Sequence, residues 1–228
     1  MTDQPLAIDL YCGLGGWTKG LMAEGYRVVG FDNERHFYGD ARYPAQLVIQ
    51  DVLTLHGRQF KDAALIVASP PCQEYSYMAM PWTRAKTIAE EYRSGVRDVA
   101  KLTALFDACF RIQREASEAA GHLVPLVVEN VCGAQAWVGR ARWHYGSFYL
   151  WGDVPALMPI VRKHVKGVKF SYGTPRDKMF GNQGPAAYGS KSSARRAASA
   201  HIAKIPFELA RHIGRQWWPD NRDRIAVQ

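Results

Sequence analysis

The sequence is poor in cysteine and has no long apolar run. Its four cysteines in 228 residues are too few and too scattered for a disulfide framework or a zinc site. No stretch reaches the roughly 18 uninterrupted apolar residues of a membrane span, and residues 1–5 lack the basic and apolar regions of a signal peptide. We therefore expect a monomer in a reduced, cytoplasmic compartment, with neither a metal nor a membrane as a partner.

Acidic residues are almost absent from one segment. Residues 161–200 hold one acid, Asp177, against nine basic residues, so this segment accounts for the whole formal net charge of +8. A basic patch confined to one segment is typical of a surface that binds a polyanion. A solvated basic loop is the other interpretation. The nine residues are Arg162, Lys163, Lys166, Lys169, Arg176, Lys178, Lys191, Arg195 and Arg196.

Short apolar runs and amphipathic stretches alternate through the first half of the chain. The runs are continuous rather than alternating in hydrophobicity, which is typical of strands buried on both faces of a parallel sheet. Helices are expected over 17–24, 96–120 and 205–213. Strands alternating with helices predict a doubly wound α/β domain. The expected strands are 6–11, 27–31, 47–49, 64–68 and 123–128, with a further strand-like run at 147–151.

A glycine-rich turn, residues 9–16 with the sequence DLYCGLGG, follows the first expected strand. Glycines there let the backbone approach a ligand closely, but the spacing fits neither the dinucleotide fingerprint nor the P-loop. Acids also follow the next two strands: Asp32, with Glu34 beside it, and Asp51. Each alone is more often a helix cap or a surface acid. Together with the turn they favour a nucleoside cofactor.

A cysteine and a carboxyl group follow two further expected strands. Cys72 lies in the sequence SPPCQ after the fourth strand, and Glu129 follows the fifth. Because neighbouring strand ends can face one pocket, the two side chains are candidates for joint chemistry, with a small buried thiol as the alternative for Cys72. Thiolate addition at C6 of cytosine makes C5 nucleophilic, and a carboxylic acid stabilises the adduct through ring N3. We expect Arg140 and Arg142 to favour the thiolate and hold the nucleotide.

In this order the motifs resemble those of the DNA cytosine-5 methyltransferase family, of a compact prokaryotic or phage type. The turn is similar to the family's D-L-F-C-G-x-G-G loop, with Tyr11 in place of Phe. Residues 71–73 and 129–131 match its P-C-Q and E-N-V motifs, residues 140–142 resemble R-x-R, and 205–210 resemble V-P-P-x-L-A. The resemblance spans residues 6–214.

This resemblance implies a Rossmann-like class I methyltransferase fold that uses S-adenosylmethionine. It implies methyl transfer to a cytosine flipped out of double-stranded DNA, with Cys72 as the nucleophile and Glu129, Arg140 and Arg142 as its catalytic partners. We expect the cytoplasm of a prokaryotic or phage-infected cell. The chain divides into a catalytic and cofactor-binding domain at 1–151, a short basic target-recognition region at 152–200 and a returning C-terminal helix at 201–228.

The resemblance also implies residue roles. The expected cofactor-binding residues are Asp9, Tyr11, Cys12, Gly13, Gly15, Gly16, Asp32, Glu34, Asp51, Pro71 and Lys204. The expected DNA-binding residues are Gln73, Ser76 and the nine basic residues of 161–200.

Four features depart from the family pattern. Aromatic and Met side chains replace the usual glycine-rich loop at 74–82, the recognition region is short, and the usual lead-in to R-x-R is missing. Lys204 stands near the position of an Asn that lies by the cofactor's methionine end in the family. Either Lys204 points into solvent, or it suits a cofactor with an extra carboxylate, whose transferred group would then not be methyl. RNA as the substrate and a catalytically silent DNA-binding protein are further alternatives.

Overall fold

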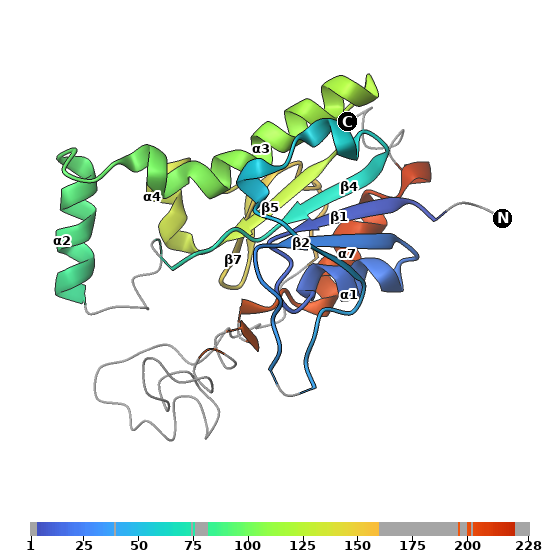
Figure 1. The fold of residues 1–228 in the computed structure, drawn as a ribbon, viewed down its shortest axis with the longest axis horizontal. Helices are drawn as coiled ribbons and strands as arrows, with labels where there is room; N and C mark the ends of the chain where they lie inside the picture. The colour runs from blue at the N-terminus through green and yellow to red at the C-terminus, as the bar shows by residue number, and fades with distance from the viewer. Residues whose placement is uncertain are drawn as a thin grey trace.

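The computed structural model describes residues 4–38, 40–73, 75, 82–159, 196, 200, 201 and 203–221. Within this part, seven strands form one sheet in the order β3-β2-β1-β4-β5-β7-β6 (Figure 1). The strands are β1 (Leu6–Leu10), β2 (Arg27–Asp32), β3 (Gln46–Ile49), β4 (Ala63–Ala68), β5 (Leu126–Asn130), β6 (Trp143–Tyr145) and β7 (Phe148–Gly152).

The five strands from β1 to β5 are parallel, and β7 runs antiparallel to both β5 and β6. The chain starts in the middle of the sheet, moves outward through β2 and β3, then returns to build β4 and β5 on the other side of β1. The order reverses between β1 and β4, which is where open α/β sheets bind ligands at their carboxyl edge. The predicted doubly wound, mostly parallel sheet is therefore confirmed.

Helices cover both faces of the sheet (Figure 1). Helix α3 (Val99–Ala120) packs on one face, where its buried Phe106 and Ile112 join Ile8 and Leu10 in one apolar cluster. Helices α1 (Gly16–Ala23) and α7 (Phe207–Gln216) pack on the other face in a second cluster. The continuous apolarity of the central strands follows from this arrangement, and β4 is buried along its whole length.

The remaining elements are short or lie at the periphery. They are α2 (Trp82–Arg93), α4 (Gln135–Val138), η1 (Val52–Thr54), η2 (Gly57–Phe60), η4 (Cys132–Ala134) and η7 (Pro219–Asn221).

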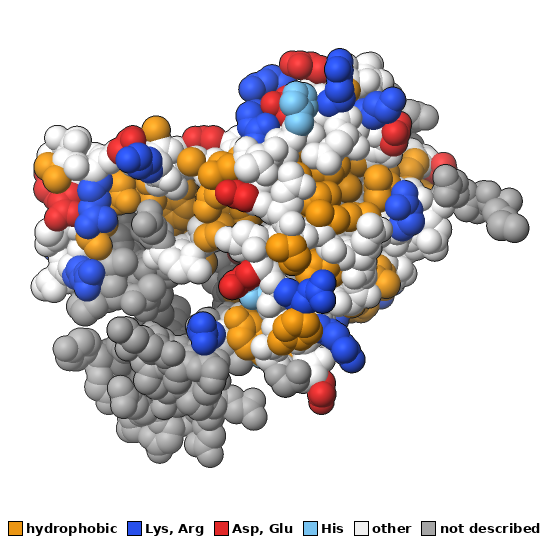
Figure 2. Space-filling model, in the orientation of Figure 1, with side chains coloured by type: hydrophobic (Ala, Val, Ile, Leu, Met, Phe, Trp, Pro, Cys, Tyr) orange, Lys and Arg blue, Asp and Glu red, His pale blue; other side chains and the backbone are white. Residues whose placement is uncertain are grey.

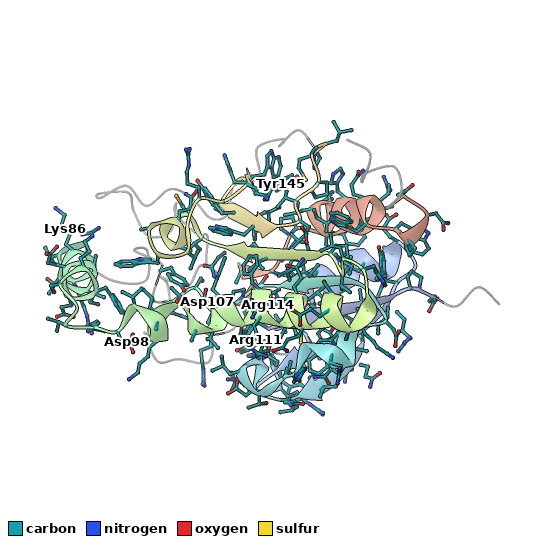
Figure 3. All side chains as sticks on the ribbon, turned by 90° about the horizontal axis from the view of Figure 1, so that it is seen from above. Lys86, Asp98, Asp107, Arg111, Arg114 and Tyr145 are labelled. Carbon is teal, nitrogen blue, oxygen red and sulfur yellow. The ribbon has the colours of Figure 1, made fainter. Side chains whose placement is uncertain are left out.

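Helix α3 is fastened to the segment after η1. Figure 3 looks down on α3, along which Asp107, Arg111 and Arg114 lie, while α2, which carries Lys86, stands at the far end. The Arg111 guanidinium donates to the carbonyl of Leu55, 2.9 Å away.

Several predicted boundaries are wrong by a few residues. Helix α3 begins at Val99 and not at 96, because the Asp98 carboxylate caps it by accepting the N–H of Ala100 at 2.9 Å. Strand β5 begins after Pro125, which has no N–H to donate, and extends through Asn130 because β7 pairs with its last residues. Glu129 therefore lies within the strand and not after it.

Helix α2 and strand β6 were not predicted from the sequence. Helix α2 is strongly charged and carries little apolar periodicity, and β6 has only three residues. Helix α7 begins at Phe207, two residues later than expected. None of the helices in the described part is long and apolar enough to cross a membrane. Most of 152–200 lies outside the described residues, so the division into three parts remains a prediction.

Two glycines allow α1 and α7 to approach closely. A Cβ added at Gly20 would collide with the Ala210 Cβ and the backbone N–H of Arg211, and one added at Gly16 would collide with the backbone of Ile205. Beside this contact, the Glu24 carboxylate accepts hydrogen bonds from Arg211 at 2.6 Å and from Arg215. The C-terminal helix is thereby fixed against the element that follows the glycine-rich turn.

We predict that Gly20→Ala destabilises the protein by about 1–3 kcal/mol, because the extra methyl group has no space between α1 and α7. Chemical denaturation followed by circular dichroism measures this. Met22→Ala, at an exposed position of the same helix, is the control and should change stability by less than about 0.5 kcal/mol. Equal stability of the two variants would contradict the close packing.

Candidate cofactor and catalytic site

The turn after β1 is held in a shape that few residue types adopt. Tyr11, Gly13 and Gly15 have φ angles of 57°, 48° and 70°, in the left-handed region. A Cβ at Gly15 would press against Pro44, whereas one at Gly13 would have nothing within 4 Å. The turn is thus packed on one side and open at Gly13, where a ligand can approach the backbone.

Tyr11 and Cys12 face the protein interior. The Tyr11 hydroxyl donates to the carbonyl of Leu105 on α3 at 2.8 Å, a bond that a Phe at this position could not make. Cys12 is buried, and this burial raises the pKa of its thiol well above its ordinary value. Both side chains therefore stabilise the turn, and any contact with a cofactor would come from their backbone.

Asp9 is buried beneath the turn with one oxygen unsatisfied. Its Oδ2 accepts a hydrogen bond from Thr18 at 2.6 Å, and the Thr18 hydroxyl also lies 2.7 Å from the Tyr43 hydroxyl. Its Oδ1 accepts no hydrogen bond from the described residues. Desolvation raises the pKa of Asp9 to about 8, although the Thr18 hydrogen bonds oppose the shift. Asp9 is therefore mostly protonated at neutral pH.

The carboxylates after β2 have different surroundings. Asp32 Oδ2 accepts the backbone N–H of Gly13 at 2.9 Å and lies 3.5 Å from His36 Nε2. Burial raises the pKa of Asp32, but hydrogen bonds from His36 and Gly13 more than offset it, so its pKa lies below its ordinary value. The Glu34 side chain is 72% exposed, and its Oε1 lies 3.6 Å from His36 Nδ1. Asp32 shapes the turn, and Glu34 points its carboxylate into solvent.

Asp51 lies after β3, beside exposed apolar side chains. Its Oδ1 accepts the N–H of Leu53 at 2.9 Å, so Asp51 serves, at least in part, as the helix cap of η1. Ile49 and Leu53 flank it in sequence, and each is 48% exposed. Two exposed aliphatic side chains can pack on the faces of a flat, polar ring, and the carboxylate between them can accept a hydrogen bond from the edge of that ring.

The loop that carries Cys72 is tied to four neighbouring elements, β1, α1, β5 and α3. The backbone N–H of Ser69 donates to Leu10 on β1, and the Ser69 hydroxyl accepts the Trp17 indole N–H at 3.0 Å. The Asn130 side chain on β5 donates to the Pro70 carbonyl at 3.0 Å. The buried Tyr75 hydroxyl donates to the Leu102 carbonyl on α3 at 2.8 Å. Cys72 is half-buried within this frame.

Glu129 lies next to this loop by strand register. Ala68 at the end of β4 pairs with Val128 on β5, and Glu129, only 5% exposed, is the next residue along β5. Because Asn130, the residue after Glu129, binds the Pro70 carbonyl, the end of β5 is joined directly to the loop that carries Cys72. The structure thus places the segments that hold these two predicted residues side by side at the carboxyl edge.

Arg140 and Arg142 are both exposed, on the segment between α4 and β6. The backbone N–H of Arg142 donates to Leu150 on β7 at 2.8 Å, and Leu150 pairs in turn with Glu129. The Arg142 backbone is therefore two strands from Glu129, about 10 Å at the usual spacing of strands. The Trp151 indole donates to the Gly139 carbonyl at 2.9 Å and fastens the segment.

Lys204 lies against the start of α1. A Cβ at Gly16 would be 3.0 Å from Lys204 Cγ, and the Lys204 side chain is half-buried, so the solvent-facing interpretation holds only in part. Desolvation lowers the pKa of Lys204 to about 8, and the positive charge of Lys19 adds to the shift.

The predicted DNA-binding residues lie mostly outside the described part of the chain. Pro71 and Gln73 are exposed beside Cys72. Arg196 has a helical backbone conformation, and its side chain is exposed. On the face in Figure 2, the Lys and Arg side chains are interspersed with Asp and Glu. Among the described residues, no group of three His, Cys, Asp or Glu could hold a metal ion. The other predicted DNA-binding residues lie outside the described part of the chain; they are Ser76, Arg162, Lys163, Lys166, Lys169, Arg176, Lys178, Lys191 and Arg195.

Several residues that shape the site were not predicted. Asn130, Thr18, Tyr43 and His36 fix the loops through their side chains. Asn130 was visible as part of the E-N-V motif, but its bond to Pro70 was not. Tyr43 and His36 come from a segment between strands with no periodic pattern, and only the fold brings them to the turn.

Residues 6–95, which include the glycine-rich turn and Cys72, match the family model for C-5 cytosine-specific DNA methylase. The match covers less than half of the chain. Glu129, Arg142 and Lys204 lie beyond the matched residues.

Solved methyltransferase structures are similar to part of the chain. A putative DNA modification methyltransferase from an Escherichia coli prophage is 20% identical over 57% of this chain and 33% of its own, with a TM-score of 0.35. The Schizosaccharomyces pombe Dnmt2 methyltransferase is 16% identical over 60% of this chain and 37% of its own, with a TM-score of 0.35. TM-scores this low carry no information on the fold beyond what the sheet topology already shows. The chain covers well under half of either structure, and no curated protein matches it.

We predict that Asp9→Asn stabilises the protein above pH 5, increasingly up to pH 8. Since the folded pKa of about 8 exceeds the ordinary value of 3.8, the unfolded chain alone loses this proton in between, and stability falls as pH rises. The amide removes this penalty, so the melting-temperature difference from wild type should grow by roughly 10 °C from pH 5 to pH 8, at about 2–4 °C per kcal/mol. Thermal scans at pH 5 and pH 8 measure it.

Asp62→Asn, at an exposed position before β4, is the control and should leave the melting temperature unchanged at both pH values. A difference between Asp9→Asn and wild type that is the same at pH 5 and pH 8 would mean that Asp9 ionises normally in the folded protein.

Proposed function

We propose that the protein transfers a methyl group from S-adenosylmethionine to C5 of cytosine in double-stranded DNA. The observation that carries this proposal is the hydrogen bond between Asn130 and Pro70, which joins the Cys72 loop to the strand end at Glu129. A thiol and a buried carboxyl group held together at the carboxyl edge suit covalent catalysis on a pyrimidine ring. The family match of residues 6–95 supports the choice of cytosine and of the cofactor.

The residues around the turn after β1 fit such a cofactor. Gly13 leaves its ligand side open, and the buried Asp9 has an oxygen that no described residue satisfies. Bound S-adenosylmethionine supplies an activated methyl group on its sulfonium. We propose that Ile49 and Leu53 enclose its adenine and that Asp51 accepts from the adenine amino group, because these side chains are exposed together after β3.

Glu34 is the better candidate for the ribose hydroxyls than Asp32. The Asp32 carboxylate already accepts the Gly13 N–H and interacts with His36, whereas the Glu34 carboxylate is mostly exposed. We propose that Glu34 accepts the hydrogen bonds of the ribose and that Asp32 acts indirectly, by fixing the backbone of the turn.

Glu34→Gln is therefore expected to weaken S-adenosylhomocysteine binding about ten- to hundredfold, the usual value of charge-assisted hydrogen bonds, and to leave the melting temperature of the free protein unchanged. Asp32→Asn is the matched variant and is expected to lower that melting temperature, because the Gly13 amide and His36 lose a charged partner. Calorimetric binding and thermal scans separate the two roles. The reverse pattern would assign the ribose to Asp32.

Cys72 and Glu129 divide the chemistry on the base. In our proposal the Cys72 sulfur adds to C6, the Glu129 carboxyl group donates its hydrogen bond to ring N3, and elimination of the thiol follows loss of the C5 proton. The base must leave the duplex to reach Cys72, because C6 is covered by its neighbours in the stack. We propose that Arg140 and Arg142, both exposed on the same side of β5, bind the phosphates of the flipped nucleotide.

The basic segment 161–200, most of which lies outside the described residues, is proposed to bind the DNA backbone, and Gln73 and Ser76 are proposed to lie nearer the base. Binding by nine basic residues would weaken steeply with salt concentration. We propose further that the enzyme acts as a monomer in the cytoplasm of a prokaryotic or phage-infected cell.

The decisive test is covalent trapping. Duplex DNA containing 5-fluorocytosine should form a denaturation-resistant complex with wild type and S-adenosylmethionine, because the fluorine cannot be eliminated. Cys72→Ala should form none, and Glu129→Gln should slow its formation about 10²–10⁴-fold. Gel electrophoresis and peptide mass spectrometry read the result. Cys132→Ala, which removes an exposed thiol, is the control and should form the complex as wild type does.

The alternatives are outcomes of the same experiment. A complex with 5-fluorocytosine RNA but not with DNA of the same sequence would show that the substrate is RNA and not DNA. Tight DNA binding without a covalent complex or any modified cytosine would indicate a silent DNA-binding protein.

A further inference from the structure

Two tyrosine hydroxyls from different loops donate to neighbouring carbonyls of α3. The Tyr11 hydroxyl, from the glycine-rich turn, donates to the Leu105 carbonyl at 2.8 Å. The Tyr75 hydroxyl, from the Cys72 loop, donates to the Leu102 carbonyl, also at 2.8 Å. The two carbonyls lie about 4.5 Å apart along the helix axis. The turn proposed to bind the cofactor and the loop that carries the proposed nucleophile therefore have one turn of a single helix as their support.

Tyr11 has a backbone conformation that disfavours a side chain. Its φ of 57° lies in the left-handed region, and no other non-glycine residue in the described part of the chain has a positive φ. Such a conformation persists only where the surroundings hold it, and it is most frequent at functional sites. The hydroxyl bond to α3 is one such restraint, and it acts next to Gly13, where the proposed cofactor meets the backbone.

Tyr75 is joined directly to the proposed nucleophile. Its backbone N–H donates to the Cys72 carbonyl at 3.1 Å, so the two residues close one turn of the loop. Tyr75 is 4% exposed, and its hydroxyl bond lies in the interior, where water does not compete for it. Any displacement of Tyr75 relative to α3 is therefore transmitted to the Cys72 backbone.

Helix α3 is a firm support for both loops. Its Phe106 and Ile112 are buried in the apolar cluster against the sheet, and the Asp98 carboxylate caps its first turn. The Arg111 guanidinium also donates to the Leu53 carbonyl at 3.3 Å, in the segment proposed to enclose the adenine. Three parts of the proposed site thus contact the same helix.

The turn and the loop are also joined to each other. The Ser69 N–H donates to the Leu10 carbonyl at 3.2 Å, and the Trp17 indole donates to the Ser69 hydroxyl at 3.0 Å. Together with the two tyrosine bonds, these contacts close a ring that consists of the turn, the Cys72 loop and α3. Neither loop can move alone in a closed ring, because the other members must take up the displacement. Loss of either tyrosine bond would open the ring and let both loops move.

We propose that the Tyr11 and Tyr75 hydroxyls are positioning groups that hold the cofactor turn and the Cys72 loop in one arrangement through α3. The inference rests on the proposed function, because that function gives the turn and the loop their roles. A phenylalanine at either position keeps the packing of the ring and leaves the helix carbonyl its intrahelical bond, so only the positioning contact is removed.

Tyr11→Phe, Tyr75→Phe and the double variant test the proposal through two measurements without DNA. Calorimetric titration with S-adenosylhomocysteine reports on the turn. The rate of Cys72 alkylation by iodoacetamide, read by peptide mass spectrometry, reports on the loop. The thiol of Cys132 is exposed and serves as the internal reference for alkylation in every variant.

Tyr26→Phe is the matched control. The buried Tyr26 hydroxyl also donates to a helix carbonyl, that of Gly214 on α7, at 2.9 Å, but α7 covers the opposite face of the sheet from α3. This variant should bind S-adenosylhomocysteine and react with iodoacetamide as wild type does. Thermal scans show that each variant is folded.

The result expected of a closed ring is that each single variant affects both loops. Tyr75→Phe should weaken S-adenosylhomocysteine binding, and Tyr11→Phe should speed Cys72 alkylation, each about three- to tenfold, the equivalent of one neutral hydrogen bond. The double variant should differ little from either single variant, because the ring is already open. With saturating cofactor and 5-fluorocytosine DNA, covalent trapping should slow by a similar factor in all three.

The proposal is overturned if each single variant affects only its own loop, or if neither differs from wild type more than Tyr26→Phe does. Additive effects in the double variant would also overturn it, since the two bonds would then act independently. Wild type that binds no S-adenosylhomocysteine would overturn the proposed cofactor but not the ring. The effect of Tyr11→Phe on Cys72 alkylation would then decide whether the ring exists.

Discussion

The parallel register at the centre of the sheet is the constraint on which the site depends. Leu10 pairs with both Phe31 and Ala68, and Ala68 pairs with Val128, so the strands end level with one another. Parallel strands joined by helical crossovers present all their carboxyl ends at one edge. The turn after β1, the acids after β2 and β3 and the Cys72 loop are neighbours for this reason alone. A shift of one strand by one residue would turn its apolar side chains to the wrong face.

Convergence at an edge does not by itself fix loops, and buried polar groups do so here. Asn130 satisfies the Pro70 carbonyl, Asp32 holds the Gly13 amide, and Trp17 donates to Ser69. Each donor or acceptor would cost free energy if it were left unpaired in the interior, so each bond selects one loop conformation. Asp9 is the exception, since one of its oxygens is unsatisfied in a buried position and its raised pKa keeps it neutral.

Sequence reasoning succeeded where local pattern and topology coincide. The apolar runs predicted the central strands, and their order predicted that the segments holding Cys72 and Glu129 would lie at one edge of the sheet, because β4 and β5 are adjacent and parallel. It failed where a residue is positioned by partners distant in sequence. Arg142 is placed by the antiparallel pair β6 and β7, and Lys204 by the glycine contact between α1 and α7. Neither position carries a periodic signal, and α2 has too little apolar periodicity to be recognised.

The charges around the turn are separated along its length. Glu34 and Asp51 follow β2 and β3 on one side of β1, and the Lys204 side chain lies against Gly16 at the start of α1. Fixed charges act more strongly near a partly buried surface than in bulk water, so a ligand with its own charge separation would bind in one direction. The acids would repel a carboxylate, and Lys204 would repel a sulfonium. In the proposed function, charge would set the direction of the cofactor along the turn, and the missing side chain at Gly13 would let it approach the backbone closely.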